Sequence, residues 1–82
     1  MYCVYILKSK LNKKSYVGST SLEVGRRLDQ HNIGSNKWTS ANGPFDLVYY
    51  ESYFCKTDAL LREKFYKTGV GKKLKKVILE NY

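Results

Sequence analysis

The chain has few acidic residues, one histidine, two cysteines and a single proline. Cys3 and Cys55 lie far apart with no CxxC motif, and one histidine cannot complete a recognised zinc pattern with them. We therefore expect both cysteines to be reduced core residues. No apolar run reaches the length of about 18 residues that indicates a transmembrane helix. The first residues lack the basic, apolar and small-residue segments of a signal peptide. We expect a cytoplasmic protein without a membrane role.

The scarcity of acidic residues leaves a strong positive charge. Fifteen Lys and Arg residues oppose seven Asp and Glu residues, which gives a formal charge of +8 over 82 residues. Such a balance favours a polyanionic partner, with nucleic acid ahead of an anionic membrane surface, although a cationic protein without such a partner is the simpler alternative. The length predicts a single domain over residues 1–82 and excludes a second one.

The N-terminal part of the chain organises the rest. Residues Tyr2–Leu7 are all β-branched, aromatic or apolar, and the length of this run suits a strand better than a helix. After a lysine-rich turn over Lys8–Lys14, a second β-favouring run follows over Ser15–Gly18. The two runs predict a β-hairpin in which Tyr5 and Tyr16 face each other across paired strands. Taken alone, a tyrosine pair indicates packing more often than chemistry.

A helix is predicted over Ser21–Asn32. Val24 and Leu28 give it a narrow apolar stripe. Arg27 and His31 are one turn apart at the edge of that stripe, so we expect both to reach the rim of the sheet. An isolated RxxxH pair is more often a solvated arginine with an incidental histidine.

The segment from Gly34 to Pro44 is a loop by composition. It carries Lys37 and Trp38, and a tryptophan in a basic loop can stack on a nucleobase or fold back over the core with equal support. A third strand is predicted over Phe45–Phe54, with Glu51 at an exposed end.

The next helix is predicted to run to Lys67, with Glu63 on the apolar side that Ala59 and Tyr66 share. A carboxylate in that position is costly unless it gains a cation or strong hydrogen bonds, which indicates a metal ion or a basic partner. The alternative is an exposed ion pair with Lys67, because a second apolar face competes for the core.

Two further helix boundaries complete the predicted order. The helix that ends at Lys67 is predicted to begin at a cap on Thr57 or Asp58. Gly69 and Gly71 then separate it from a last helix over Lys72–Glu80. Lysines crowd the start of this last helix; such a run is usually a solvated face, but in a chain of this charge it can track phosphates. The predicted fold is α+β, a small three-stranded antiparallel β-sheet packed with helices in the order β-β-α-β-α-α.

This arrangement resembles the GIY-YIG nuclease superfamily. Cys3-Val4-Tyr5 stands in place of the first motif and Tyr16-Val17-Gly18 in place of the second. Arg27, His31 and Glu63 occupy the positions of the family's catalytic arginine, catalytic histidine and metal-binding glutamate. The resemblance covers nearly the whole chain and is to small stand-alone bacterial members, related to the N-terminal nuclease domain of the excinuclease C subunit. Cys3 replaces a glycine of the first motif, and the late asparagine of larger members has no counterpart.

The resemblance implies a DNA endonuclease that hydrolyses phosphodiester bonds with Mg²⁺ or Mn²⁺. Tyr5 is expected to act as general base and Tyr16 to orient the water or the phosphate. A free phenol titrates at about 10, so nearby cations must favour its phenolate. His31 is expected to place or relay a proton, Arg27 to bind the scissile phosphate, and Glu63 to hold the metal ion.

The resemblance leaves the substrate open between branched, flapped and single-stranded DNA in repair or recombination, and it does not exclude a homodimer or a protein partner. The alternative function is a non-catalytic basic nucleic-acid-binding module. Such a module would be expected to lose one of the five catalytic residues, and none is lost. The residues expected to contact nucleic acid are basic or aromatic: Lys14, Arg26, Lys37, Trp38, Lys67, Lys72 and Lys73.

Overall fold

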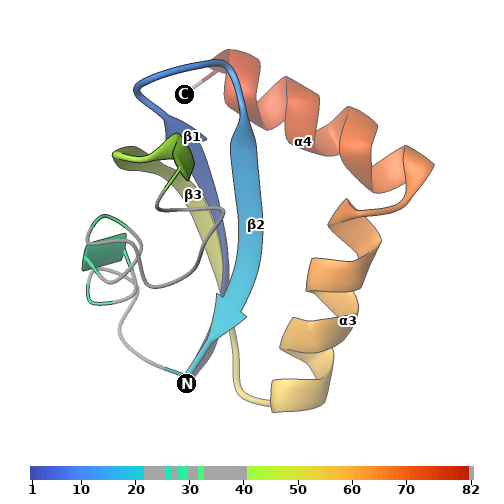
Figure 1. Cartoon of the computed structure of the whole chain (residues 1–82). Coiled ribbons are helices and arrows are strands. Elements are labelled where there is room, and N and C mark those ends of the chain that lie inside the picture. The colour runs from blue at the N-terminus through green and yellow to red at the C-terminus, as the bar shows by residue number, and fades with distance from the viewer. Residues whose placement is uncertain (22–25, 27, 30–31, 33–40, 82) are drawn as a thin grey trace.

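The structure is a computed structural model that describes residues 1–21, 26, 28–29, 32 and 41–81. The elements whose bounds lie in the described ranges are three strands and two helices (Figure 1): β1 (Tyr2–Ser9), β2 (Ser15–Thr20), β3 (Phe45–Tyr53), α3 (Lys56–Tyr66) and α4 (Gly69–Asn81). The predicted α+β class is therefore confirmed. No helix in the described ranges is long and apolar enough to cross a membrane.

The sheet is antiparallel and has the order β2-β1-β3, so β1 is the central strand and β2 lies at an edge. Opposite Tyr5 lie Gly18 on β2 and Tyr50 on β3, and Leu7 pairs with Tyr16. The predicted hairpin is thus confirmed, but Tyr5 and Tyr16 are not directly opposite each other: they lie on one face of the sheet at diagonal positions, two residues apart in the register. Each of its strands extends beyond the apolar run that predicted it, because backbone pairing continues into polar residues at the strand ends.

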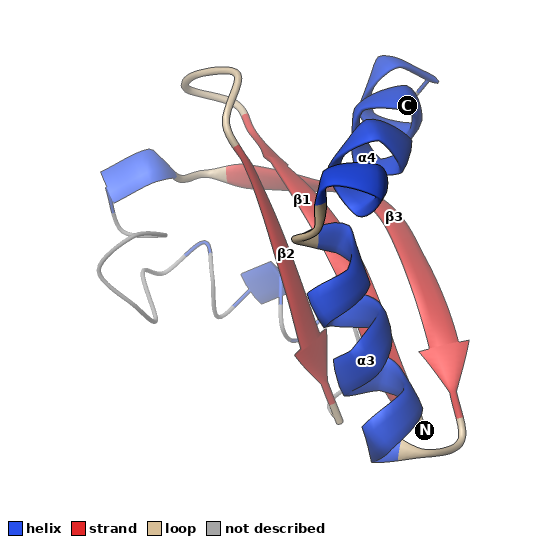
Figure 2. Cartoon of the chain, turned by 90° about the vertical axis from the view of Figure 1, so that its right-hand side faces the viewer, coloured by secondary structure: helices blue, strands red, loops and turns tan. Residues whose placement is uncertain are grey.

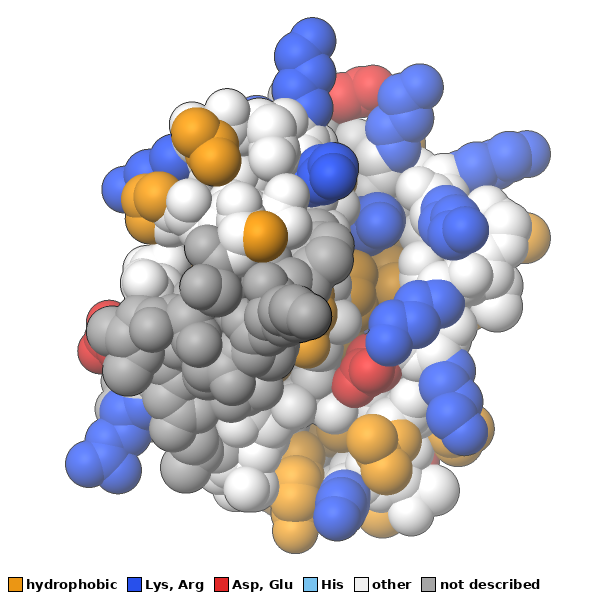
Figure 3. Space-filling view, viewed as in Figure 1, with side chains coloured by type: hydrophobic (Ala, Val, Ile, Leu, Met, Phe, Trp, Pro, Cys, Tyr) orange, Lys and Arg blue, Asp and Glu red, His pale blue; other side chains and the backbone are white. Residues whose placement is uncertain are grey.

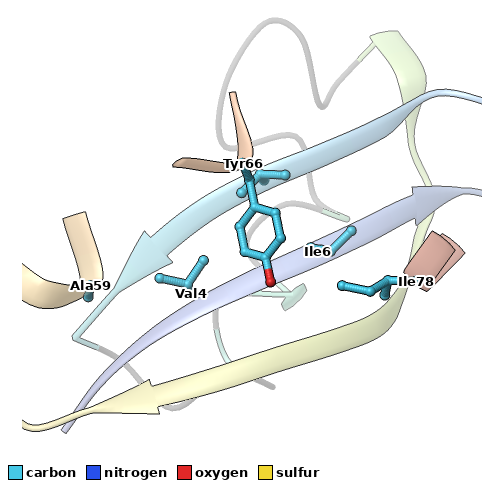
Figure 4. Packing of buried hydrophobic residues seen from close by; sticks show 6 residues of the cluster. Val4, Ile6, Ala59, Tyr66 and Ile78 are labelled. Atoms are coloured by element: carbon cyan, nitrogen blue, oxygen red, sulfur yellow. The ribbon is translucent and has the colours of Figure 1, made fainter. Parts of the chain in front are cut away.

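Both described helices cover one face of the sheet (Figure 2). The buried side chains on that face form one cluster, shown in Figure 4: Val4, Ile6, Val17, Ala59, Tyr66 and Ile78. Side chains alternate along a strand, so the residues between them point to the opposite face. There Tyr5, Leu7 and Phe45 form a second buried cluster, packed by Tyr16, Leu28 and Leu47.

Helical residues are described at positions 26, 28, 29 and 32, inside the predicted first helix. Leu28 packs on the second cluster, as its place on the apolar stripe predicts. Asn32 fixes the start of β3, because its side-chain Oδ1 accepts a hydrogen bond of 2.7 Å from the backbone N–H of Phe45. The rest of this helix and most of the loop that follows lie outside the described residues.

Helix α3 begins earlier than predicted. Cys55 occupies the cap position without a side-chain hydrogen bond, and the helix starts at Lys56 rather than after a Thr57 or Asp58 cap. Both cysteines are free, as expected, but Cys55 is exposed, so only Cys3 is a core residue. The extended backbone at Cys55 turns the chain directly from β3 into α3, and this tight connection leaves its side chain in solvent.

Helix α4 starts at Gly69, so the two glycines lie inside it and do not separate the helices. The break falls at Thr68, whose hydroxyl donates to the Phe65 carbonyl at 2.6 Å and accepts from the Gly71 N–H at 3.2 Å. Gly71 is buried, and a Cβ at this position would lie 1.8 Å from the Phe65 carbonyl oxygen. Glycine is required here because α4 begins directly against the end of α3.

Glu51 is not at an exposed end, as had been predicted, but in a polar cluster between β3 and α3. Its carboxylate accepts hydrogen bonds from the hydroxyls of Tyr49, Tyr53 and Tyr66 at 2.6–2.8 Å and from Arg62 Nε at 2.9 Å. Only 14% of its side chain is exposed. The three phenols and the guanidinium replace the water that the carboxylate loses, and they tie α3 to the sheet.

These contacts predict how stability depends on pH. Burial alone would raise the pKa of Glu51, but the hydrogen bonds from Arg62 and the three tyrosines outweigh it and lower that pKa from 4.5 to about 2. Because the folded-state value is depressed, the stabilisation is complete above pH 4.5 and is lost as the pH falls toward 2. The free energy of unfolding, measured with urea, should fall by about 2 kcal/mol over this pH window.

The control for this prediction is Glu51→Gln. The variant should be less stable at pH 7 and should show a flatter dependence on pH than the parent. The pKa of Glu63 is also lowered, so the stability of both proteins should still depend on pH to some extent. An equal slope in parent and variant would assign the acid sensitivity to other carboxylates.

Candidate active site

The two motif tyrosines pack together on the face of the sheet opposite α3 and α4. Their ring centroids are 6.3 Å apart with the planes tilted by 32°. Gly18 lies beside both rings: a Cβ there would be 2.4 Å from the Tyr5 hydroxyl and 3.0 Å from the Tyr16 ring. The glycine that closes the second motif is therefore needed for space, because any side chain would displace the Tyr5 hydroxyl.

The two tyrosines differ in access to solvent. Tyr5 is 1% exposed and belongs to the buried cluster, whereas Tyr16 is partly exposed and packs at the margin of that cluster. A group that takes a proton from water must be reached by that water. The burial therefore favours Tyr16 over Tyr5 for this role. The resemblance had led us to expect Tyr5 as the general base.

Glu63 approaches the same edge strand from the other face. Its Oε1 accepts a hydrogen bond of 2.6 Å from Ser19 Oγ on β2, and its Oε2 forms a 2.8 Å ion pair with Lys67 Nζ. The buried Ala59 and Tyr66 show that α3 turns the predicted side toward the sheet, with Leu61 exposed on the competing face. Glu63 thus lies on the side of α3 that faces the sheet, and the ion pair with Lys67, which was the predicted alternative, forms there.

The charge on Glu63 is stabilised by these contacts. Its side chain is 21% exposed, and burial alone would raise its pKa. The hydrogen bonds from Lys67 and Ser19 outweigh this effect and lower the pKa. Glu63 is therefore an anionic oxygen donor at neutral pH, which is the ligand type that Mg²⁺ requires.

The face of the sheet that carries Tyr5 and Tyr16 and the face that α3 and α4 cover meet at the outer edge of β2. A hollow of about 320 Å³ lies there, lined by Ser15, Tyr16, Val17, Lys67 and Lys75. Ser19, which holds Glu63, is three residues beyond Tyr16 on the strand, about 10 Å away at the usual rise per residue. Figure 3 shows Lys and Arg side chains gathered over the side on which α3 and α4 lie, with acidic atoms among them.

A metal ion at this edge would have Glu63 as its protein carboxylate. Among the described residues, no three His, Cys, Asp or Glu side chains come together as a metal site. Water and phosphate oxygens would complete the coordination, and Lys67 would have to leave the Oε2 atom that it now occupies. The donor chemistry fits Mg²⁺, with weak binding expected when no substrate is present.

The remaining predicted site residues divide into two groups. Lys14, Arg26, Lys67, Lys72 and Lys73 are exposed, as a phosphate-contacting role requires. Arg27, His31, Lys37 and Trp38 lie outside the described residues. The prediction missed Ser19 and Lys75: Ser19 was beyond the motif, and Lys75 was counted with its solvated neighbours although it stands one turn after Gly71 and three residues before Ile78.

Comparison with known proteins agrees with this geometry. A family model described as the GIY-YIG catalytic domain matches residues 1–76. The chain is 37% identical over 78 residues to the UPF0213 protein SERP0126 of Staphylococcus epidermidis, covering 94% of this chain and 93% of that protein. A UPF0213 protein of Staphylococcus aureus gives the same identity and coverage.

A more distant kind of protein also matches. The chain is 41% identical over 66 residues to the structure-specific endonuclease subunit slx1 of Aspergillus terreus, an alignment that covers 72% of this chain and 17% of that longer protein. No solved structure gives a significant match.

Proposed function

The chain belongs to the GIY-YIG family of nuclease domains, and from this premise we propose that it is a Mg²⁺-dependent DNA endonuclease that selects its substrate by structure, in repair or recombination. The observation that carries the proposal is the edge of β2, where Tyr5 and Tyr16 pack over Gly18 and an anionic Glu63 is held on Ser19. The selectivity for DNA structure draws on the A. terreus relative, which is named a structure-specific endonuclease subunit.

The residues of this edge suit hydrolysis of a phosphodiester. In the proposed step, the phenolate oxygen of Tyr16 takes a proton from water, the water oxygen bonds to phosphorus, and the bond from phosphorus to the 3′ oxygen breaks. The 3′ oxygen leaves as an alkoxide and takes a proton from solvent. Tyr5, which is buried beside Tyr16, would keep that ring in position. Among the exposed lysines, Lys67 and Lys72 would hold neighbouring phosphates.

Glu63 would hold the metal ion in this scheme. Mg²⁺ supplies positive charge that stabilises the phosphate and the departing oxygen. Lys67, once displaced from Glu63, would be available to a phosphate oxygen. Arg27 and His31 enter the proposal through the family positions alone, Arg27 for the scissile phosphate and His31 for proton placement.

A cleavage assay on purified protein tests the proposal. Labelled duplex, single-stranded, flapped and branched DNA would be incubated with the parent protein in Mg²⁺ and in EDTA. We expect cuts in Mg²⁺ only, fastest on one of the flapped or branched forms. Binding that weakens with salt, without cutting of any substrate, would instead identify the non-catalytic nucleic-acid-binding module.

A further inference from the structure

One lysine of α4 faces the body of the protein instead of solvent. Gly71 and Ile78 mark the buried side of the helix, and Lys75 lies between them and is partly buried. Its neighbours Lys73 and Lys76 are exposed on the same helix. Lys75 therefore occupies a position where an apolar residue would be expected.

The ammonium of Lys75 is not neutralised within the part of the chain that the structure describes. The salt bridges found there join Lys10 to Asp46, Arg62 to Glu51 and Lys67 to Glu63. Burial, and then the nearby charge of Lys72, lower the pKa of Lys75. Holding a cation in such a place costs free energy unless an anion joins it.

Lys75 lines the hollow at the outer edge of β2. It lines the same hollow as Lys67, with Ser15 and Tyr16 across from the helices on β2. Two lysines and Ser15 are among the residues that line this space of about 320 Å³, and a pair of lysines beside a hydroxyl-bearing side chain suits an oxyanion. The hollow is open at the edge of the sheet, so a chain-like ligand can pass along it.

We propose that Lys75, with Ser15, forms a subsite for a backbone phosphate of DNA next to the one that is cut. This inference rests on the proposed function. Along β2, Glu63 is held at Ser19, and Lys75 lines a hollow with the Ser15–Val17 end. The reacting phosphate would therefore lie between them, and the hollow would receive its neighbour. The subsite would fix the register of the strand relative to Tyr16.

The first experiment uses inorganic phosphate, titrated into the parent protein and followed through backbone amide NMR signals. We expect the signals of Tyr16, Val17 and Lys75 to shift together. In Lys75→Met the shifts at Tyr16 and Val17 should be lost, and in Lys76→Met, which removes the same charge from an exposed position, they should persist. Shifts spread evenly over all lysines, or none at all, would overturn the subsite. The parent titration is informative even if a variant fails to fold.

The second experiment measures binding of an oligonucleotide duplex in EDTA at several salt concentrations. Lys75→Met should weaken binding about tenfold and lower the slope of log K against log salt by about one, whereas Lys76→Met should change the slope little. Lys75→Arg should retain the parent slope. Equal losses for Lys75→Met and Lys76→Met would overturn the inference.

The two proposals fail in different ways. If the parent cuts DNA in Mg²⁺ and Lys75→Met behaves like Lys76→Met, the subsite is wrong and the nuclease stands. If phosphate shifts the signals of Tyr16 and Val17 while the parent cuts no DNA, Lys75 belongs to a phosphate-binding site and the nuclease is wrong.

Discussion

Glu63→Gln should reduce the rate of DNA cleavage in Mg²⁺ by about 10²–10³-fold. The amide keeps the size of the side chain and can still accept the hydrogen bond from Ser19, but it carries no charge to hold a divalent cation. The loss should therefore appear in the chemical step, measured under single-turnover conditions with enzyme in excess over a labelled substrate.

Metal binding gives a readout that does not depend on cleavage. Broadening of NMR signals by Mn²⁺ should centre on Glu63 and Ser19 in the parent and should disappear in Glu63→Gln. Glu80→Gln is the matched control, since it removes the same charge from an exposed site on α4. Parent-like cleavage by Glu63→Gln, with broadening retained, would exclude Glu63 as the metal ligand.

Tyr16→Phe should lower the cleavage rate by about 10²–10⁴-fold while DNA binding in EDTA stays within about twofold of the parent. The substitution removes the oxygen that is proposed to take the proton and leaves the ring contact with Tyr5. Because Tyr5 is 1% exposed, Tyr5→Phe should cost less activity than Tyr16→Phe.

Tyr50→Phe is the control for this comparison, because Tyr50 lies opposite Tyr5 on β3 and is half exposed. Its activity should match the parent. If Tyr5→Phe loses more activity than Tyr16→Phe, with both variants folded, then the base is Tyr5 and solvent reaches it in the DNA complex. If neither loses activity, the tyrosines are only a packing pair.

The strands could be predicted because short runs rich in β-branched and aromatic residues lie between turn-forming segments. The face of α3 that packs on the sheet could not be predicted, because Ala59 and Tyr66 on one side of the helix compete with Leu61 and Phe65 on the other. The packing against β1 settles it, and such a contact between distant segments leaves no mark in the periodicity of the helix itself.

Glu51 shows a second limit of prediction. A glutamate near the end of an aromatic strand indicates an exposed end, yet its partners come from two elements: Tyr49 and Tyr53 on β3, and Arg62 and Tyr66 on α3. Only the docked helix brings the guanidinium and the third phenol to the carboxylate. The basic surface was predicted from net charge alone, but the distinction between Lys75 and its exposed neighbours needed the orientation of α4.

The separation along the chain between the parts of the site has a consequence for newly made protein. The hairpin with Tyr5, Tyr16 and Gly18 forms from local contacts, whereas Ser19 and Glu63 are 44 residues apart and meet only after α3 has docked. Local contacts close with less loss of chain entropy and form sooner. A chain still being synthesised therefore has its hairpin in place before Glu63 reaches β2, so the proposed cleavage of DNA would begin only once the whole domain has folded.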